Sequence, residues 1–239
     1  AKTAGVKHFV FASSCSVYGI ADAEPRTEKS ETNPLTAYAK SKVNSEIGLE
    51  PLADKNFRVT CLRFATACGY SDRLRLDLVL NDFVASAITA KKITILSDGT
   101  PWRPLIHVKD MARAMDWAIN RKTGDDFLII NTGSNQWNYQ VKELAQAVQK
   151  YFPDIAVEIN ENAQPDKRSY KVNFNLFEQM GGDYQPQVSL SAAVEDLKNG
   201  LLQIDFKDSE FRQSKLIRLH TISFLLKQKL IDENLFYIK

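Results

Sequence analysis

Cysteine and histidine are scarce in this sequence. It has three cysteines in 239 residues, an odd number with no Cys-x-x-Cys pair, which argues against both a disulfide framework and a zinc site. The three histidines, at positions 8, 107 and 220, lie far apart along the chain. We therefore expect no metal site and, by default, a reducing cytoplasmic location.

Long hydrophobic runs and a strong excess of charge are also missing. No apolar run approaches the ~18 residues of a membrane-spanning helix, and the first residues, AKTAGVKHFV, lack a signal-peptide pattern. The formal net charge is +2, and no basic run is interleaved with aromatic residues. The sequence therefore predicts neither membrane binding nor nucleic-acid binding.

A further absence concerns glycine. None of the ten glycines forms part of a Gly-x-Gly-x-x-Gly motif. A dinucleotide-binding fold uses that turn to bring its backbone close to a pyrophosphate at a helix N-terminus. These 239 residues therefore contain no recognisable pyrophosphate loop.

What is present is an alternation of strand and helix patterns. Apolar runs rich in β-branched and aromatic residues predict strands over 7–13, 57–65, 92–96, 126–133 and 156–160. Helical patterns cover 35–52, 76–90, 109–120 and 140–152. Asn33 and Pro34 are expected to begin the first helix as its N-cap and first residue. Such an alternation predicts an α/β fold with a parallel sheet.

The last residues, 208–239, have a helical pattern. Their hydrophobic residues are spaced to form one apolar side that we expect to pack against the body: Phe211, Ile217, Phe224, Leu225 and Leu230.

Three residues suggest a proton-transfer site. Ser14, in the stretch SSCSVYG, follows the first predicted strand, and ligands bind at the carboxyl ends of parallel strands. Tyr38 and Lys42 are four residues apart on a predicted helix and so share one face. A lysine ammonium stabilises a neighbouring phenolate, which makes Tyr38 a candidate acid/base near neutral pH. Alone, this pair is more consistent with a helix-surface tyrosine beside a solvated lysine than with a catalytic site.

In combination, four segments resemble the extended short-chain dehydrogenase/reductase family, the NAD-dependent nucleotide-sugar epimerases and dehydratases. They are FVFASSCSVYG, NPLTAYAKSK, LRFATACGYSDRLR and SDGTPWRPLIHVKDMARA, and the similarity runs from about Lys7 to Tyr170. The resemblance implies NAD (or NADP) as cofactor, a nucleotide-diphosphate sugar as substrate and a homodimer when the protein is complete.

The resemblance also implies roles for individual residues. The catalytic residues are expected to be Ser14, Tyr38 and Lys42. The expected cofactor-binding residues are Ser13, Tyr38, Lys42, Phe64 and Thr66. The expected substrate-binding residues are Ser14, Cys15, Ser16, Thr66, Arg103 and Arg168. The two arginines would meet the diphosphate, and a guanidinium fork suits phosphate oxygens.

The departures from the family pattern matter as well. Pro104 follows Arg103 where the family usually has aspartate, and Thr66-Ala67-Cys68-Gly69 replaces its Asn-x-Tyr-Gly. Dehydratase members carry an Asp–Glu pair where this chain has Cys15–Ser16. The glycine-rich segment and the acidic ribose-binding residue are missing. We therefore expect this chain to correspond to the C-terminal two-thirds of such an enzyme, to hold NAD poorly and to be inactive alone.

The sequence thus predicts a partial Rossmann-like parallel sheet, a smaller α/β substrate-binding domain and a helical tail. The expected boundaries are 1–69 with 106–134, 70–105 with 135–207, and 208–239. The expected function is a nucleotide-sugar epimerase in which Tyr38 is the acid/base. A dehydratase or 4-reductase on the same scaffold, and a non-catalytic nucleotide-sugar-binding chain, remain alternatives.

Overall fold

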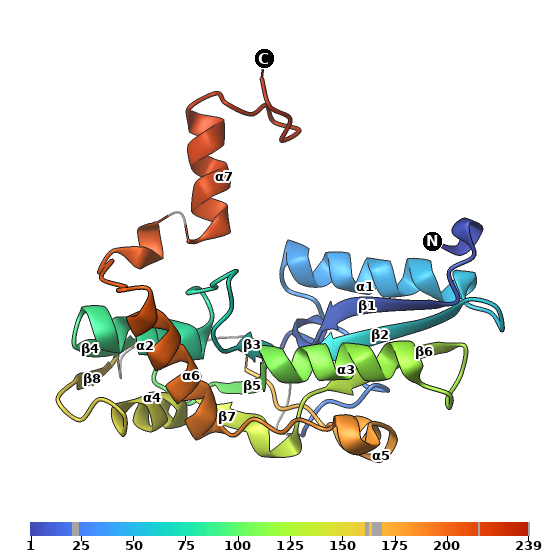
Figure 1. Cartoon of the computed structure of the whole chain (residues 1–239), viewed down its shortest axis with the longest axis horizontal. Coiled ribbons are helices and arrows are strands. Elements are labelled where there is room, and N and C mark those ends of the chain that lie inside the picture. The colour runs from blue at the N-terminus through green and yellow to red at the C-terminus, as the bar shows by residue number, and fades with distance from the viewer. Residues whose placement is uncertain (21–23, 161–162, 164–168, 215, 239) are drawn as a thin grey trace.

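The computed structural model describes residues 1–20, 24–160, 163, 169–214 and 216–238. Two groups of strands and helices lie side by side, and the C-terminal segment extends away from them (Figure 1). Across these described residues, none of the helices combines the length and the apolar character that crossing a membrane requires.

The first group is built on a parallel sheet. Its strands β1 (His8–Ser14), β2 (Arg58–Phe64) and β6 (Phe127–Thr132) lie in the order β1-β2-β6, with Ser14 opposite Phe64 and Phe64 opposite Thr132. Helices α1 (Ala37–Leu49) and α3 (Val108–Asn120) lie on either side of this sheet (Figure 1). Because all three strands end together, the residues that follow them meet at one edge. The expected α/β class is confirmed.

The second group contains two smaller sheets. Strand β5 (Trp102–His107) pairs in parallel with β3 (Thr66–Cys68) and antiparallel with β7 (Asn138–Gln140). Strands β4 (Lys92–Ile95) and β8 (Ala156–Ile159) form a separate parallel pair. The sequence did not predict β3, β5 or β7. Two of them are only three residues long, and β5 contains Pro104, which weakens the strand pattern.

Helices cover these smaller sheets. They are α2 (Val79–Thr89), α4 (Val141–Gln149) and α6 (Leu190–Gln203), whose buried faces share one hydrophobic core. Short α5 (Asn175–Met180) instead joins the core of the first group, where the Phe177 ring meets Trp117 edge-on at 5.4 Å. The proposed boundaries between the two domains stay a prediction. Residues 135–207 were assigned to the substrate-binding domain, but α5, which lies within that range, packs against the first group.

The start of α1 differs from the expected one. Thr36, not Asn33, is the N-cap, and its hydroxyl accepts a hydrogen bond from the Ala39 N–H at 3.1 Å. The Asn33 N–H donates to the Val17 carbonyl at 2.9 Å. That bond ties the residues before Thr36 to the turn after β1, so they do not join the helix.

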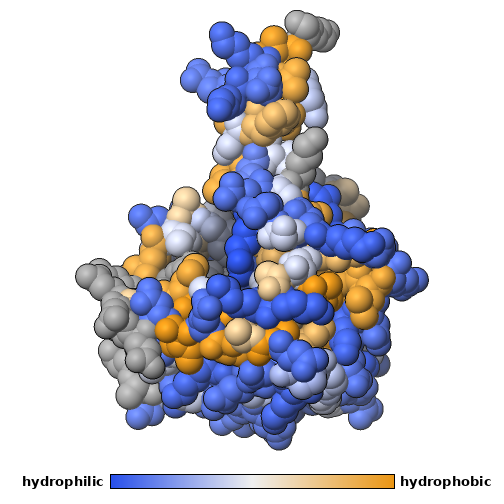
Figure 2. Space-filling view, turned by 90° about the vertical axis from the view of Figure 1, so that its left-hand side faces the viewer, coloured by the Kyte–Doolittle hydropathy of each residue, from blue (hydrophilic) through white to orange (hydrophobic). Residues whose placement is uncertain are grey.

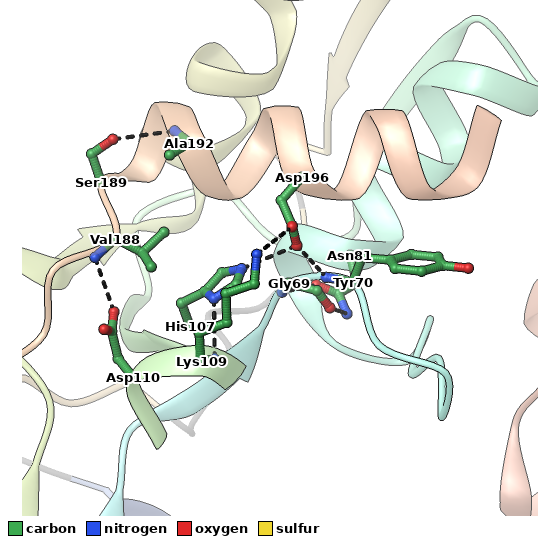
Figure 3. A network of polar contacts seen from close by, with 10 residues as sticks. All are labelled: Gly69, Tyr70, Asn81, His107, Lys109, Asp110, Val188, Ser189, Ala192 and Asp196. Carbon is green, nitrogen blue, oxygen red and sulfur yellow. Dashed lines mark hydrogen bonds and ion pairs between the residues drawn. The ribbon is translucent and has the colours of Figure 1, made fainter. Parts of the chain in front are cut away.

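A polar network connects β5 and α3 with α6 (Figure 3). Asp196 on α6 accepts hydrogen bonds from the Tyr70 N–H at 2.9 Å and from Lys109 Nζ at 3.0 Å, and it lies 3.2 Å from Nε2 of buried His107. Gly69 has φ +105°, and a Cβ there would lie 2.3 Å from His107 Nε2. Only glycine therefore fits beside this histidine.

The C-terminal segment is only partly helical. Phe211 is buried in the second core, whereas no residue of α7 (Arg218–Lys227) is buried. Phe224 and Leu230 are about half exposed, at 47% and 48%. Of the residues expected to form the apolar side, Phe211 packs into the second core as predicted. Helix α7 stands clear of the body, with both hydrophobic and hydrophilic residues on its surface (Figures 1 and 2).

Candidate active site

Tyr38 and Lys42 lie side by side near the end of β1. Lys42 Nζ is 5.3 Å from the centre of the Tyr38 ring and 4.8 Å from that of Phe11, and it donates a hydrogen bond to the Ala12 carbonyl at 2.7 Å. Partial burial lowers the pKa of the Lys42 ammonium from its ordinary value. The Tyr38 side chain is 56% exposed, so its phenol is open to a ligand.

The turn after β1 holds the three predicted substrate contacts Ser14, Cys15 and Ser16. Ser14 caps this turn, its Oγ accepting a hydrogen bond from the Ser16 N–H at 3.2 Å. The Cys15 thiol is fully buried and donates to the Arg63 carbonyl, and burial raises its pKa above the ordinary value. Ser16 lines the pocket described below, and its Oγ is buried and makes no hydrogen bond with the residues described.

Beneath the turn lies a buried ion pair that the sequence did not predict. Arg63 contacts Glu46 through two hydrogen bonds of 3.0 and 2.7 Å, and its Nη1 donates to the Tyr18 hydroxyl at 3.0 Å. The Ser13 hydroxyl donates to Glu46 at 2.6 Å. The Ser13 hydroxyl therefore belongs to a network that joins α1 to the sheet. Phe64, another predicted cofactor contact, is also buried, at 3% exposure.

A pocket of about 600 Å³ opens between the two groups of elements. One part of its wall comes from the first group and includes Ser16, Gly19, Leu35 and Thr36, and Thr66 of β3 adjoins them. The other part comes from α2, β4, β5 and the residues next to α2 and β4: Asp77, Leu78, Val79, Asp82, Phe83, Thr94, Ile95, Leu96, Ser97 and Arg103. Val141, Tyr170 and Arg212 complete the lining. Ser14, Tyr38 and Lys42 are not among the lining residues, although Tyr38 and Lys42 lie on α1, which begins after Thr36.

Two carboxylates are found among the described residues that line this pocket, and each contacts an arginine. Asp77 is held by Arg75 through two 2.7 Å contacts, and Asp82 is held by Arg212 in the same way. Arg103 donates to the Trp102 carbonyl at 2.9 Å. Arg168, the second predicted phosphate contact, lies outside the described residues. The structure thus brings Ser16, Thr66 and Arg103 to one pocket, next to the helix that carries Tyr38 and Lys42.

Arg212 was not among the expected site residues. It lies 109 positions after Arg103 in a segment with no motif, so spacing along the chain gave no indication of it. Glu46 carried a weak signal, because it lies four residues after Lys42 on the same predicted helix.

Comparison with known proteins identifies the family of this chain. The model of the NAD dependent epimerase/dehydratase family matches residues 1–133, more than half of the 239 residues. The chain therefore belongs to this family, and the resemblance noted in the sequence is confirmed. The relatives described next are enzymes.

Two curated relatives illustrate the range of activities among the proteins that resemble this chain. A UDP-glucose 4-epimerase of Rhizobium meliloti (strain 1021) is 27% identical over 220 residues, which are 83% of this chain and 65% of that protein. UDP-glucuronic acid decarboxylase 6 of Arabidopsis thaliana is 25% identical over 216 residues, 87% of this chain and 59% of that protein. The chain thus spans less than two-thirds of the length of either relative.

Solved structures show the same fold. MoeE5 in complex with UDP-glucose and NAD is 25% identical with a TM-score of 0.71, over 84% of this chain and 67% of that one. TunA, an NAD-dependent NDP-hexosamine 5,6-dehydratase, is 23% identical with a TM-score of 0.72, over 87% of this chain and 66% of that one.

Proposed function

We propose that this chain forms the substrate-binding and proton-transfer part of an NAD-dependent nucleotide-sugar epimerase. The observation that carries the proposal is the pocket itself. Its lining includes Ser16, Thr66 and Arg103 of β5, and also Thr36, the N-cap of the helix that carries the Tyr38–Lys42 pair. A nucleotide sugar needs polar contacts for a sugar ring, a cation for its diphosphate and an apolar surface for its base, and the lining supplies all three.

The residues at the end of β1 suit the nicotinamide end of NAD. Lys42 already points to the carboxyl end of the strand, where its ammonium bonds the Ala12 carbonyl, and Thr66 begins the strand that follows β2. Tyr38, Lys42 and Thr66 would hold that end of the cofactor. When bound, NAD supplies the hydride acceptor and donor of the reaction.

The side chains of this chain would then manage the proton and the position of the sugar. Tyr38 Oη takes the proton of a ring hydroxyl, and the neighbouring Lys42 ammonium stabilises the phenolate that forms. Ser14 Oγ bonds the same sugar oxygen, and Arg103 holds the diphosphate through charge-assisted hydrogen bonds. Once the hydride had returned to the opposite face of the ring carbon, Tyr38 would give the proton back to the sugar oxygen, and the product would be the epimer.

Two observations favour epimerisation over dehydration within this family. Dehydration needs an acid and a base beside the sugar, and the residues at the family's Asp–Glu positions are Cys15 and Ser16. The Cys15 thiol is fully buried, with its pKa raised by burial, so it makes a poor proton donor. Among the described lining residues, the two carboxylates, Asp77 and Asp82, are each paired with an arginine.

The test separates turnover from binding. In the protein that carries these residues, assayed with NAD and UDP-glucose, Tyr38→Phe should lower kcat by about 10²- to 10⁴-fold while substrate affinity changes little. Arg103→Ala is the matched variant and should weaken UDP-glucose binding about 10- to 100-fold in a calorimetric titration. Turnover by Tyr38→Phe within a few-fold of wild type would refute the acid/base role. A 4-keto-6-deoxy product would refute epimerisation.

A further inference from the structure

Arg212 lies in the pocket wall although it comes from the C-terminal segment. The segment is fixed by Phe211, which is 1% exposed and packs edge-on against Phe206 at 6.1 Å between ring centres. The Arg212 guanidinium also lies over the Phe211 ring, 5.2 Å from its centre. The position of Arg212 is therefore set by core packing as well as by its own polar contacts.

The polar contacts of Arg212 use only part of its guanidinium. Nε and Nη2 contact the two carboxylate oxygens of Asp82 at 2.7 Å each, and Nη2 also donates to Ser86 Oγ at 2.9 Å. A guanidinium has five N–H donors, so the two on Nη1 remain. Nη1 makes no hydrogen bond with any of the residues described. Arg212 thus presents a fixed hydrogen-bond donor at the pocket wall.

The location of Arg212 indicates which part of a ligand it meets. Its partners Asp82 and Ser86 lie on α2, within the group that forms the α2 and β4 part of the lining. Tyr38 and Lys42 lie on α1, the helix that follows Leu35 and Thr36 in the other part of the lining. If the sugar lies beside Tyr38, as the proposed function requires, the nucleoside must extend toward α2 and β4.

Charge distinguishes the base from the diphosphate as the partner of Arg212. Asp82 neutralises the positive charge of Arg212, and a diphosphate placed there would also face this carboxylate. A neutral acceptor such as a carbonyl oxygen meets no such repulsion.

We propose that Arg212 is a specificity-determining residue that donates from Nη1 to a carbonyl oxygen of the nucleotide base. This inference rests on the proposed function of the pocket and adds to it that the C-terminal segment takes part in choosing the nucleotide. Uracil has such carbonyl oxygens and adenine has none, so the contact favours uridine nucleotides over adenosine nucleotides.

The test is a calorimetric titration of the chain with UDP and with ADP. Arg212→Ala and Arg212→Lys should each bind UDP about 10-fold or more weakly than wild type, while ADP affinity stays within about 2-fold. Arg212→Lys retains the charge beside Asp82 but lacks the fork, so it separates the donor from the ion pair. Lys207→Ala removes a cation from the same segment, where Lys207 pairs with exposed Asp205, and should change neither affinity.

Each other outcome overturns a stated part of the proposal. Unchanged UDP affinity in both Arg212 variants would remove Arg212 from the site. An equal loss for UDP and ADP would contradict the base contact and favour a phosphate or purely structural role. If Arg103→Ala weakens UDP binding while the Arg212 variants do not, the proposed function stands and this inference fails. If the wild type binds neither nucleotide, both fail.

Discussion

At the scale of single residues, the Glu46–Arg63 ion pair has the largest predicted energetic effect. Both side chains are buried, 3% and 6% exposed, and their fork contacts are 3.0 and 2.7 Å. Glu46→Ala leaves a buried, unpaired guanidinium, so we expect the free energy of unfolding to fall by about 3–5 kcal/mol. Urea denaturation of the two proteins measures this difference.

A surface ion pair is the control for that prediction. Lys92 and Glu158 lie 3.0 Å apart with side chains 45% and 57% exposed. Glu158→Ala should change stability by about 1 kcal/mol or less, because water screens both charges. Equal effects of Glu46→Ala and Glu158→Ala would show that burial does not set the energy of the Glu46–Arg63 pair.

At the scale of elements, the start of α1 decides where Tyr38 lies. Thr36 caps the helix two residues before Tyr38, so the cap fixes the first turn that carries the phenol. Thr36→Ala should cost about 1 kcal/mol of stability, whereas Thr36→Ser should retain most of it because serine is also a good N-cap. Thermal unfolding followed by circular dichroism gives both values.

Asn33→Ala tests the alternative helix start in the same experiment. The Asn33 N–H donates to Val17, and the substitution keeps that backbone bond. Its side chain makes no capping contact among the described residues, so we expect a smaller loss than for Thr36→Ala. A larger loss for Asn33→Ala would place the helix start where the sequence pattern placed it.

At the scale of the whole molecule, Asp196 connects α6 to the rest of the chain (Figure 3). Burial by itself raises the pKa of this carboxyl, but hydrogen bonds from Tyr70 and Lys109 and the electrostatic interactions with His107 and Lys109 lower it overall. Its folded pKa is therefore below its unfolded pKa. The resulting stability is present above about pH 4, the ordinary pKa of aspartate, and is lost as pH falls through the folded pKa.

Asp196→Asn should therefore be less stable than wild type at pH 7 and should lose less stability on acidification between about pH 5 and pH 3. Denaturation at a series of pH values measures both effects. Asp205→Asn, which changes an exposed carboxylate paired with Lys207, is the control and should follow the wild-type curve. Parallel curves for Asp196→Asn and wild type would show that Asp196 adds no pH-dependent stability.

The sequence by itself determined the class of fold, the first sheet and the Tyr38–Lys42 pair. These depend on local patterns, namely apolar runs, strand–helix alternation and a four-residue spacing, which act over one element at a time. Strands β3 and β7 escaped prediction because three residues carry too little pattern, and the N-cap was misplaced because a contact with Val17 is not local.

Only the tertiary structure decided what surrounds the pocket. Arg212 meets Asp82 across 130 positions of sequence, and Arg63 meets Glu46 across 17. The Ser13 hydroxyl turned out to bond Glu46 within the protein. These contacts form because packing brings segments together that lie apart in the sequence. For Arg63, Glu46 and Ser13, burial also removes water as a partner, so their polar groups must bond one another.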